Sequence, residues 1–126
     1  MFGLFINCSG APFVADILAN LKRDETRPRD VFRAIMGKRV ALIETGTGPV
    51  PIVRGYATLA SARRVSFADV AARAAARILG TPYDIPPGGT RVFYHLTRVR
   101  PCRPYPLPPH INHGRSYTEF TRPAGK

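Results

Sequence analysis

Residues 17–27 read Ile-Leu-Ala-Asn-Leu-Lys-Arg-Asp-Glu-Thr-Arg, and the periodicity of the chain changes within this stretch. Its apolar residues continue a pattern at helical spacing that predicts a helix over residues 11–21. From Lys22 onward the stretch is polar, and Pro28 biases Arg27 towards an extended conformation. The sequence therefore predicts a helix that leads directly into a charged strand or arm.

The densest group of charged side chains is formed by Lys22, Glu25 and Arg27. Side chains alternate along an extended segment, so Glu25 and Arg27 should point to the same face. A carboxylate beside two cations can accept a hydrogen bond from a base edge or position a proton, while the cations hold a phosphate. A mixed charge run is also typical of a solvated face, and spacing alone leaves both interpretations open.

Strands and helices are interleaved along the rest of the chain. The turn residues at 46–49 predict that the strands on either side of them pair antiparallel, with a bulge or bend at Gly55. Helical spacing predicts a helix over residues 66–79, on whose surface Arg73 pairs with Asp69. Apolar runs predict four strands, over residues 3–8, 39–44, 52–60 and 91–100.

The length of 126 residues suits a single domain, whose residues from about 101 to 126 form a proline-rich C-terminal extension. Proline excludes helix and central strand, so we expect this extension to wrap the domain in extended form. No apolar run is long enough to cross a bilayer, and the first residues lack the features of a secretory signal. These observations predict a cytoplasmic protein with no membrane partner; the oligomeric state is left open.

The charge balance favours a polyanionic partner. Nineteen Lys and Arg residues against eight Asp and Glu residues give a net charge of +11, and most of the bases are arginines. Arginine matches phosphate with a planar fork and stacks on bases. An arginine-rich composition also arises in proteins from GC-rich genomes, and charge alone indicates attraction rather than function.

The sequence lacks the cofactor and catalytic motifs of most enzyme classes. Cys8 and Cys102 are far apart, and His110 and His113 lie in a proline-rich loop with no carboxylate nearby, so we expect no metal and no other cofactor. Phosphate loops, dinucleotide-binding glycine patterns, zinc-protease motifs and nucleophile elbows are missing from the sequence.

The segment around Lys22 resembles the ASCH family of the PUA-like superfamily, whose signature is Gly-x-Lys-x-x-Glu-x-Arg. Lys22, Glu25 and Arg27 match it, and Asn20 stands where the signature has glycine. Asparagine tolerates the left-handed conformation that a glycine adopts, so this departure is mild. Further similarity lies in residues 37–43, 52–57, 94–100 and 104–107.

The resemblance implies an α+β fold, a PUA-like and mostly antiparallel β-barrel of five or six strands with flanking helices, and a cleft that holds the charged residues of the motif. It also implies RNA or a modified nucleotide as the ligand. Some ASCH proteins are amidohydrolases of acetylated cytidine with a threonine nucleophile at the place of Glu25. Thr26 should face the other way on a strand, which puts that chemistry in doubt. Other members are ribonucleases in which the motif lysine matters.

The predicted binding residues are Lys22, Glu25, Arg27, Tyr56, Tyr94 and His95. Tyr56 and Tyr94 are the aromatic side chains expected to stack on a base, although most aromatic residues of a domain are core. A nuclease without a metal would need a base, for which His95, Glu25 and Tyr56 are candidates. The first hypothesis is an RNA-binding or nucleotide-binding module; the alternatives are a hydrolase of the ASCH type and a protein-interaction domain.

Overall fold

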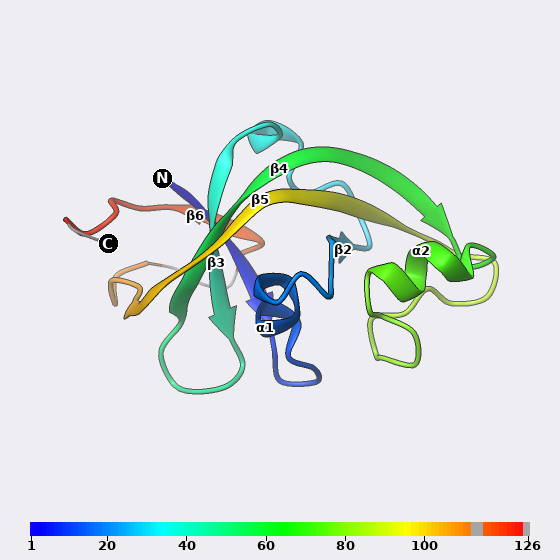
Figure 1. Cartoon of the computed structure of the whole chain (residues 1–126), viewed down its shortest axis with the longest axis horizontal. Coiled ribbons are helices and arrows are strands. Elements are labelled where there is room, and N and C mark those ends of the chain that lie inside the picture. Colours follow the sequence, from blue (N-terminus) through cyan, green and yellow to red (C-terminus); the bar gives the residue numbers. More distant parts are fainter. Residues whose placement is uncertain (112–114, 125–126) are drawn as a thin grey trace.

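The computed structural model describes residues 1–111 and 115–124, which form an α+β fold (Figure 1). His113, considered above as a ligand, lies outside the described residues. No helix in the described ranges is long and apolar enough to cross a membrane. In chain order the elements are β1 (Phe2–Asn7), α1 (Phe13–Leu18), β2 (Asp24–Arg27), a 3-10 turn (Arg33–Ile35), β3 (Arg39–Thr45), β4 (Ile52–Ser66), α2 (Val70–Ala75), β5 (Thr90–Pro106) and β6 (Tyr117–Glu119).

The strands form one six-stranded sheet in the order β2-β5-β4-β3-β1-β6. Among the described residues only β1 and β3 pair in parallel, so the expectation of a mostly antiparallel sheet is confirmed. Closure into a barrel is not seen, because no pairing among the described residues joins the outer strands β2 and β6. In Figure 1, β4 and β5 run together as a long curved ribbon that ends near α2.

The central strand β3 is buried on both faces. Val40 and Leu42 pack with α1 on one side, whereas Ala41 and Ile43 pack on the other side in a cluster that includes residues from the C-terminal part of the chain. A strand buried on both faces reads as a continuous apolar run, as residues 40–43 do. The N-terminal and C-terminal parts of the chain therefore cover opposite faces of one sheet.

The predicted hairpin of β3 and β4 is confirmed, and so is the irregularity at Gly55. The pairing of β4 with β5 shifts register between Val53 and Gly55. A side chain at Gly55 would lie 2.5 Å from the carbonyl oxygen of Arg100 and 2.6 Å from the Leu18 side chain of α1. Gly55 thus allows α1 to pack directly on the sheet.

Both helices are shorter than their periodicity predicts. Helix α1 has six residues and follows Pro12, and α2 starts only at Val70, with the Asp69 carboxylate accepting a hydrogen bond from the Ala72 N–H at 2.9 Å. Ser66, the predicted start of the second helix, instead pairs with Thr90 in the ribbon. Strand pairing has overridden local helix preference there.

The prediction of a surface pair between Arg73 and Asp69 is wrong. Arg73 is buried and forms two hydrogen bonds to the Asp84 carboxylate, at 2.9 and 3.1 Å, while its guanidinium lies over the Phe67 ring. The hydrogen bond from Arg73 lowers the pKa of Asp84 to about 2. Arg73 therefore links α2, through Asp84, to the loop that leads into β5.

The proline-rich segment is part of the sheet, contrary to expectation. Strand β5 continues to Pro106, and Pro101 pairs with Gly55 of β4. Strand β2 pairs with β5 only as far as His95, so the later part of β5 has a partner strand on one side only. An edge of this kind accepts proline because no second ladder needs its N–H.

The packing at Gly55 predicts that Gly55→Ala lowers the free energy of unfolding by about 1–3 kcal/mol, the usual cost of forcing a methyl group into a filled site. Urea unfolding followed by circular dichroism measures the change. Gly48→Ala is the control, because a Cβ atom there meets nothing within 4 Å. Equal effects of the two substitutions would contradict the proposed role of Gly55.

Candidate functional site

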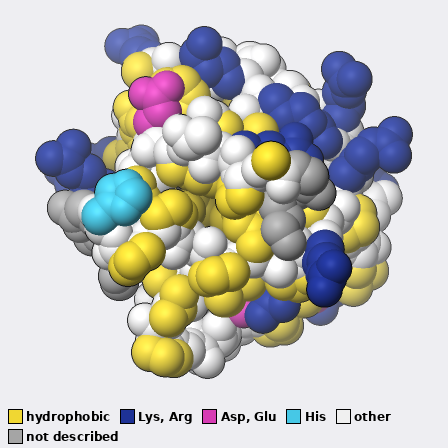
Figure 2. Space-filling model, turned by 90° about the vertical axis from the view of Figure 1, so that its left-hand side faces the viewer, with side chains coloured by type: hydrophobic (Ala, Val, Ile, Leu, Met, Phe, Trp, Pro, Cys, Tyr) yellow, Lys and Arg dark blue, Asp and Glu magenta, His cyan; other side chains and the backbone are white. Residues whose placement is uncertain are grey.

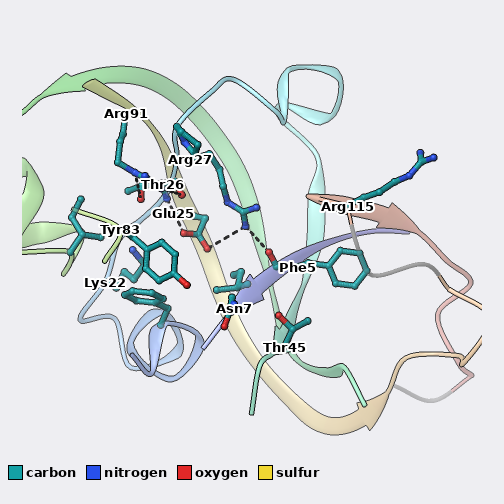
Figure 3. Close-up of a pocket in the computed structure, with 14 residues that line it drawn as sticks. Phe5, Asn7, Lys22, Glu25, Thr26, Arg27, Thr45, Tyr83, Arg91 and Arg115 are labelled. Atoms are coloured by element: carbon teal, nitrogen blue, oxygen red, sulfur yellow. Dashed lines mark hydrogen bonds and ion pairs between the residues drawn. The ribbon is translucent and has the colours of Figure 1, made fainter. Parts of the chain in front are cut away.

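A pocket of about 430 Å³ opens where the end of β1 approaches β2 and the loop after α2 (Figure 3). Its wall mixes apolar rings with charged side chains from segments far apart in the sequence. The lining residues are Phe5, Ile6, Asn7, Phe13, Lys22, Glu25, Thr26, Arg27, Pro28, Thr45, Ile78, Tyr83, Arg91 and Arg115. Lys22, Glu25 and Arg27, predicted to lie together, do so here.

The chain enters the pocket through a sharp turn at Asn20. Its φ of 61° is the left-handed conformation anticipated for the place where the signature has glycine. The N–H groups of Leu21 and Lys22 donate to the Asp16 carbonyl at 2.9 and 3.1 Å, which closes the end of α1. The turn directs Lys22 away from the α1 axis and towards α2.

Lys22 is almost fully buried, with 1% of its surface exposed. Its Nζ donates to the Ala76 carbonyl at 2.7 Å, at the C-terminal end of α2, and lies 4.9 Å from the centre of the Phe13 ring. Burial lowers the pKa of Lys22 below the ordinary lysine value, and the nearby Glu25 carboxylate opposes this shift. The pocket thus holds an amine that loses its proton more readily than a surface lysine does.

Glu25 is 5% exposed, and only one of its two oxygens accepts a hydrogen bond from the described residues. Oε1 accepts a hydrogen bond from the Thr26 N–H at 2.8 Å. Oε2 is buried without a hydrogen-bond donor among the described residues, and Nη2 of Arg27 lies 3.7 Å from it. Figure 3 shows this carboxylate near the centre of the pocket. A buried acceptor without a donor is rare in native proteins and calls for an explanation.

Arg27 and Arg91 line the pocket from β2 and β5. Arg27 donates to the Phe5 carbonyl at 2.6 Å and lies over the Phe32 ring, which fixes its guanidinium beside Glu25. Arg91 donates to the Thr26 hydroxyl and carbonyl oxygens, both at 3.3 Å. The Thr26 side chain is therefore directed to Arg91, as its alternation with Glu25 on β2 requires.

Four cationic side chains and one carboxylate line the pocket: Lys22, Arg27, Arg91, Arg115 and Glu25. The sequence did not identify Arg91, Arg115, Asn7 or Tyr83 as pocket residues. Arg91 reaches the pocket because β2 pairs with β5 in the register that sets Arg27 opposite Val92. Tyr83 reaches it from the loop after α2. No local motif marks either residue, because contacts between segments far apart in the sequence bring both to the pocket.

The rings of Tyr56 and Tyr94, which the sequence analysis expects to stack on a base, are buried in the core and do not line the pocket. The Tyr94 hydroxyl donates to the Asp30 carboxylate and accepts from the Val31 N–H, each at 2.8 Å, and burial raises its pKa to about 12. The Tyr56 hydroxyl lies 2.8 Å from that of Tyr105. These hydroxyl groups hold the structure together and do not line the pocket.

His95 also lies outside the pocket. Its Nδ1 is 3.2 Å from the Asp24 carboxylate, on the register pair where β2 and β5 meet, and 45% of its side chain is exposed. The structure therefore does not support His95 as a base acting with Lys22. Among the described residues no three His, Cys, Asp or Glu side chains are grouped to hold a metal ion.

Comparison with solved structures shows the fold. The crystal structure of ASCH from Zymomonas mobilis matches 96% of this chain and 87% of its own, with a TM-score of 0.71 and 18% sequence identity. A mutant of the same Zymomonas mobilis protein matches 96% of this chain and 90% of its own, with a TM-score of 0.66 and 16% identity. No protein-family model matches the chain, and no curated protein does. The ASCH fold expected from the resemblance is confirmed.

The burial of Lys22 predicts a specific pH dependence of stability. Its folded pKa lies below the unfolded value, so between the two values the unfolded chain binds more protons and stability rises with pH. Wild-type protein should therefore gain stability relative to Lys22→Met as the pH rises towards the unfolded lysine pKa of about 10.4, measured by urea unfolding. Lys38→Met removes the same charge from an exposed position and should keep the wild-type pH profile. A Lys22→Met profile parallel to that of the wild type would contradict the assignment.

Proposed function

Starting from an ASCH fold with a charged pocket, we propose that this protein binds RNA or a modified nucleotide in the pocket around Lys22, Glu25 and Arg27. The observation that carries the proposal is the composition of the wall, to which four cationic side chains and a single buried carboxylate contribute. A cleft lined by one sign of charge concentrates the opposite charge, and phosphate is the common anion that arginine forks match.

The arrangement of the charged groups suits a nucleotide better than a simple anion. Arg115 is exposed at the mouth of the pocket, where it can meet a phosphate, whereas Glu25 is buried and repels one. The rings of Tyr83 and Phe13 also line the pocket and supply apolar wall for a planar base. On the face in Figure 2, Lys and Arg side chains also outnumber acidic ones.

Cleavage of RNA in the same pocket is the second candidate function, and the state of Lys22 favours it. A buried lysine beside a carboxylate can stabilise charge that develops on a phosphate or transfer a proton. Amide hydrolysis through a threonine nucleophile is less well supported, because Glu25 occupies that place and the Thr26 hydroxyl accepts a hydrogen bond from Arg91. Recovery of labelled single-stranded RNA intact after incubation would favour binding alone.

A matched pair of arginine substitutions tests the proposal. Arg115→Ala should weaken binding of single-stranded RNA and lower the slope of log affinity against log salt by about one, because one phosphate contact is lost. Arg33→Ala removes the same charge from a side chain that is 90% exposed and does not line the pocket, and should leave both quantities nearly unchanged. Filter binding at several salt concentrations measures them.

Equal losses for the two variants would mean diffuse charge attraction without use of the pocket. RNA binding that does not depend on salt would contradict the proposal and favour the protein-interaction alternative. Arg73 is unsuitable as a control, because its hydrogen bonds to Asp84 hold α2 in place.

A further inference from the structure

We infer that four exposed arginines on the face of the sheet away from α1 form a second binding surface, which holds backbone phosphates of an RNA outside the pocket. This arginine cluster consists of Arg39 of β3, Arg98 and Arg100 of β5, and Arg122 of the segment after β6. The inference rests on the proposed function only for the identity of the partner, because none of the four residues lines the pocket.

Strand pairing brings the cluster together. Side chains alternate along β3, so Arg39 lies on the same face as Ala41, which packs on the side of the sheet away from α1. Strand β4 sets Thr58 opposite Arg39 and Tyr56 opposite Arg100. Residues that face each other in an antiparallel pair point to the same side. The arginines of β3 and β5 therefore flank the same stretch of β4 on one face.

The C-terminal segment adds a further guanidinium above these strands. Cζ of Arg122 lies 4.4 Å from the centre of the Tyr56 ring, beside the place where Arg100 leaves β5. None of the four arginines forms an ion pair with a described residue. Glu44, the carboxylate of β3, lies on the opposite face by alternation and pairs with Arg54. The cluster is therefore a patch of positive charge that carboxylates of the described chain do not neutralise.

A β-bulge places Arg98 in the cluster. The pairing of β4 with β5 shifts register between Tyr56 and Thr58, and the extra residue is on β5. Arg98 has a φ of 51°, the left-handed conformation that glycine or asparagine adopts more easily. Bulges redirect side chains and occur often next to functional sites. An exposed arginine in this conformation is a poor choice for stability alone, which points to a use for its side chain.

The bulge also fixes the guanidinium of Arg39. Its Nη1 donates to the Arg98 carbonyl oxygen at 2.7 Å and to the Thr58 hydroxyl oxygen at 3.4 Å. No described residue accepts a hydrogen bond from Nε or Nη2, so this edge of the guanidinium is free for a ligand. Two N–H groups on one edge match two oxygens of a phosphate, and a guanidinium already held in place loses less entropy on binding.

The surroundings of the cluster fit a phosphate backbone better than an acidic protein. Protein interfaces usually have an apolar core, whereas contacts to a nucleic-acid backbone come from arginine, lysine and hydroxyl groups. Large exposed apolar side chains of the described chain do not belong to β3, β4, β5 or the segment after β6: they are Leu21, Val50, Val70 and Leu79. RNA is therefore the partner that this face suits best.

Two substitutions within the cluster test the inference. Arg98→Gly removes a cation without disturbing the bulge, because glycine adopts a φ of 51° freely, and this variant should resist urea at least as well as the wild type. Arg98→Gly and Arg39→Gln should each weaken binding of a long single-stranded RNA and lower the slope of log affinity against log salt by about one, for one lost phosphate contact. Filter binding at several salt concentrations measures both quantities.

Arg64→Gln is the control matched to Arg39→Gln. Arg64 is also an exposed strand residue, and its Nη1 also contacts a threonine hydroxyl, that of Thr90 at 3.2 Å. It lies near the end of β4 that approaches α2, away from the cluster (Figure 1). The Arg64→Gln protein should keep the wild-type slope. Binding of a nucleoside monophosphate, which the pocket alone accommodates, should not change in Arg98→Gly or Arg39→Gln protein.

The outcomes separate this inference from the proposed function. Equal slopes for Arg39→Gln and Arg64→Gln protein would overturn the inference, because diffuse attraction treats exposed arginines alike. Wild-type RNA binding by Arg98→Gly protein that folds normally would also overturn it. Either result leaves the proposed function standing while Arg115→Ala weakens RNA binding. Loss of the Arg115→Ala effect, with the effects in the cluster kept, would instead overturn the pocket as the RNA site.

Discussion

The pairing of four residues of β2 with β5 is the constraint on which the pocket depends. Its register sets Glu25 opposite Tyr94 and Arg27 opposite Val92, so the carboxylate and the guanidinium face the pocket and Thr26 faces Arg91. A slip of one residue would turn all three side chains to the opposite face. Contacts on either side of β2 hold the register: Lys22 binds the end of α2 through Ala76, and Arg27 binds β1 through Phe5.

This arrangement does not serve stability alone. A buried carboxylate oxygen without a donor costs about 1–3 kcal/mol, and a buried lysine bears a further desolvation cost that lowers its pKa. Apolar side chains of similar volume would usually stabilise such a site as well or better. Groups held at a cost by a well-paired sheet are the pattern expected of a binding or catalytic site, where a ligand completes the interactions that the protein leaves open.

The sequence predicted the parts of the structure that local chemistry controls. The clustering of Lys22, Glu25 and Arg27, the left-handed turn at Asn20 and the irregularity at Gly55 follow from spacing, from the tolerance of asparagine for positive φ and from the lack of a Cβ atom. The errors concern long-range pairing. Ser66, at the predicted start of the second helix, lies in strand β4, and the prolines of β5 lie at an edge of the sheet. Arg73 forms its ion pair with Asp84 in the following loop rather than with Asp69. The burial of Tyr56 and Tyr94 was not predicted, because exposure depends on how the faces of the sheet are covered, which no short motif encodes.

A crystal structure of the protein with a bound nucleotide is the most direct test of the central claim that the pocket around Lys22, Glu25 and Arg27 is the binding site. The account predicts the nucleotide in this pocket, with its phosphate towards Arg115. A nucleotide bound only on another face of the sheet, or bound in the pocket with its phosphate against Glu25, would contradict it.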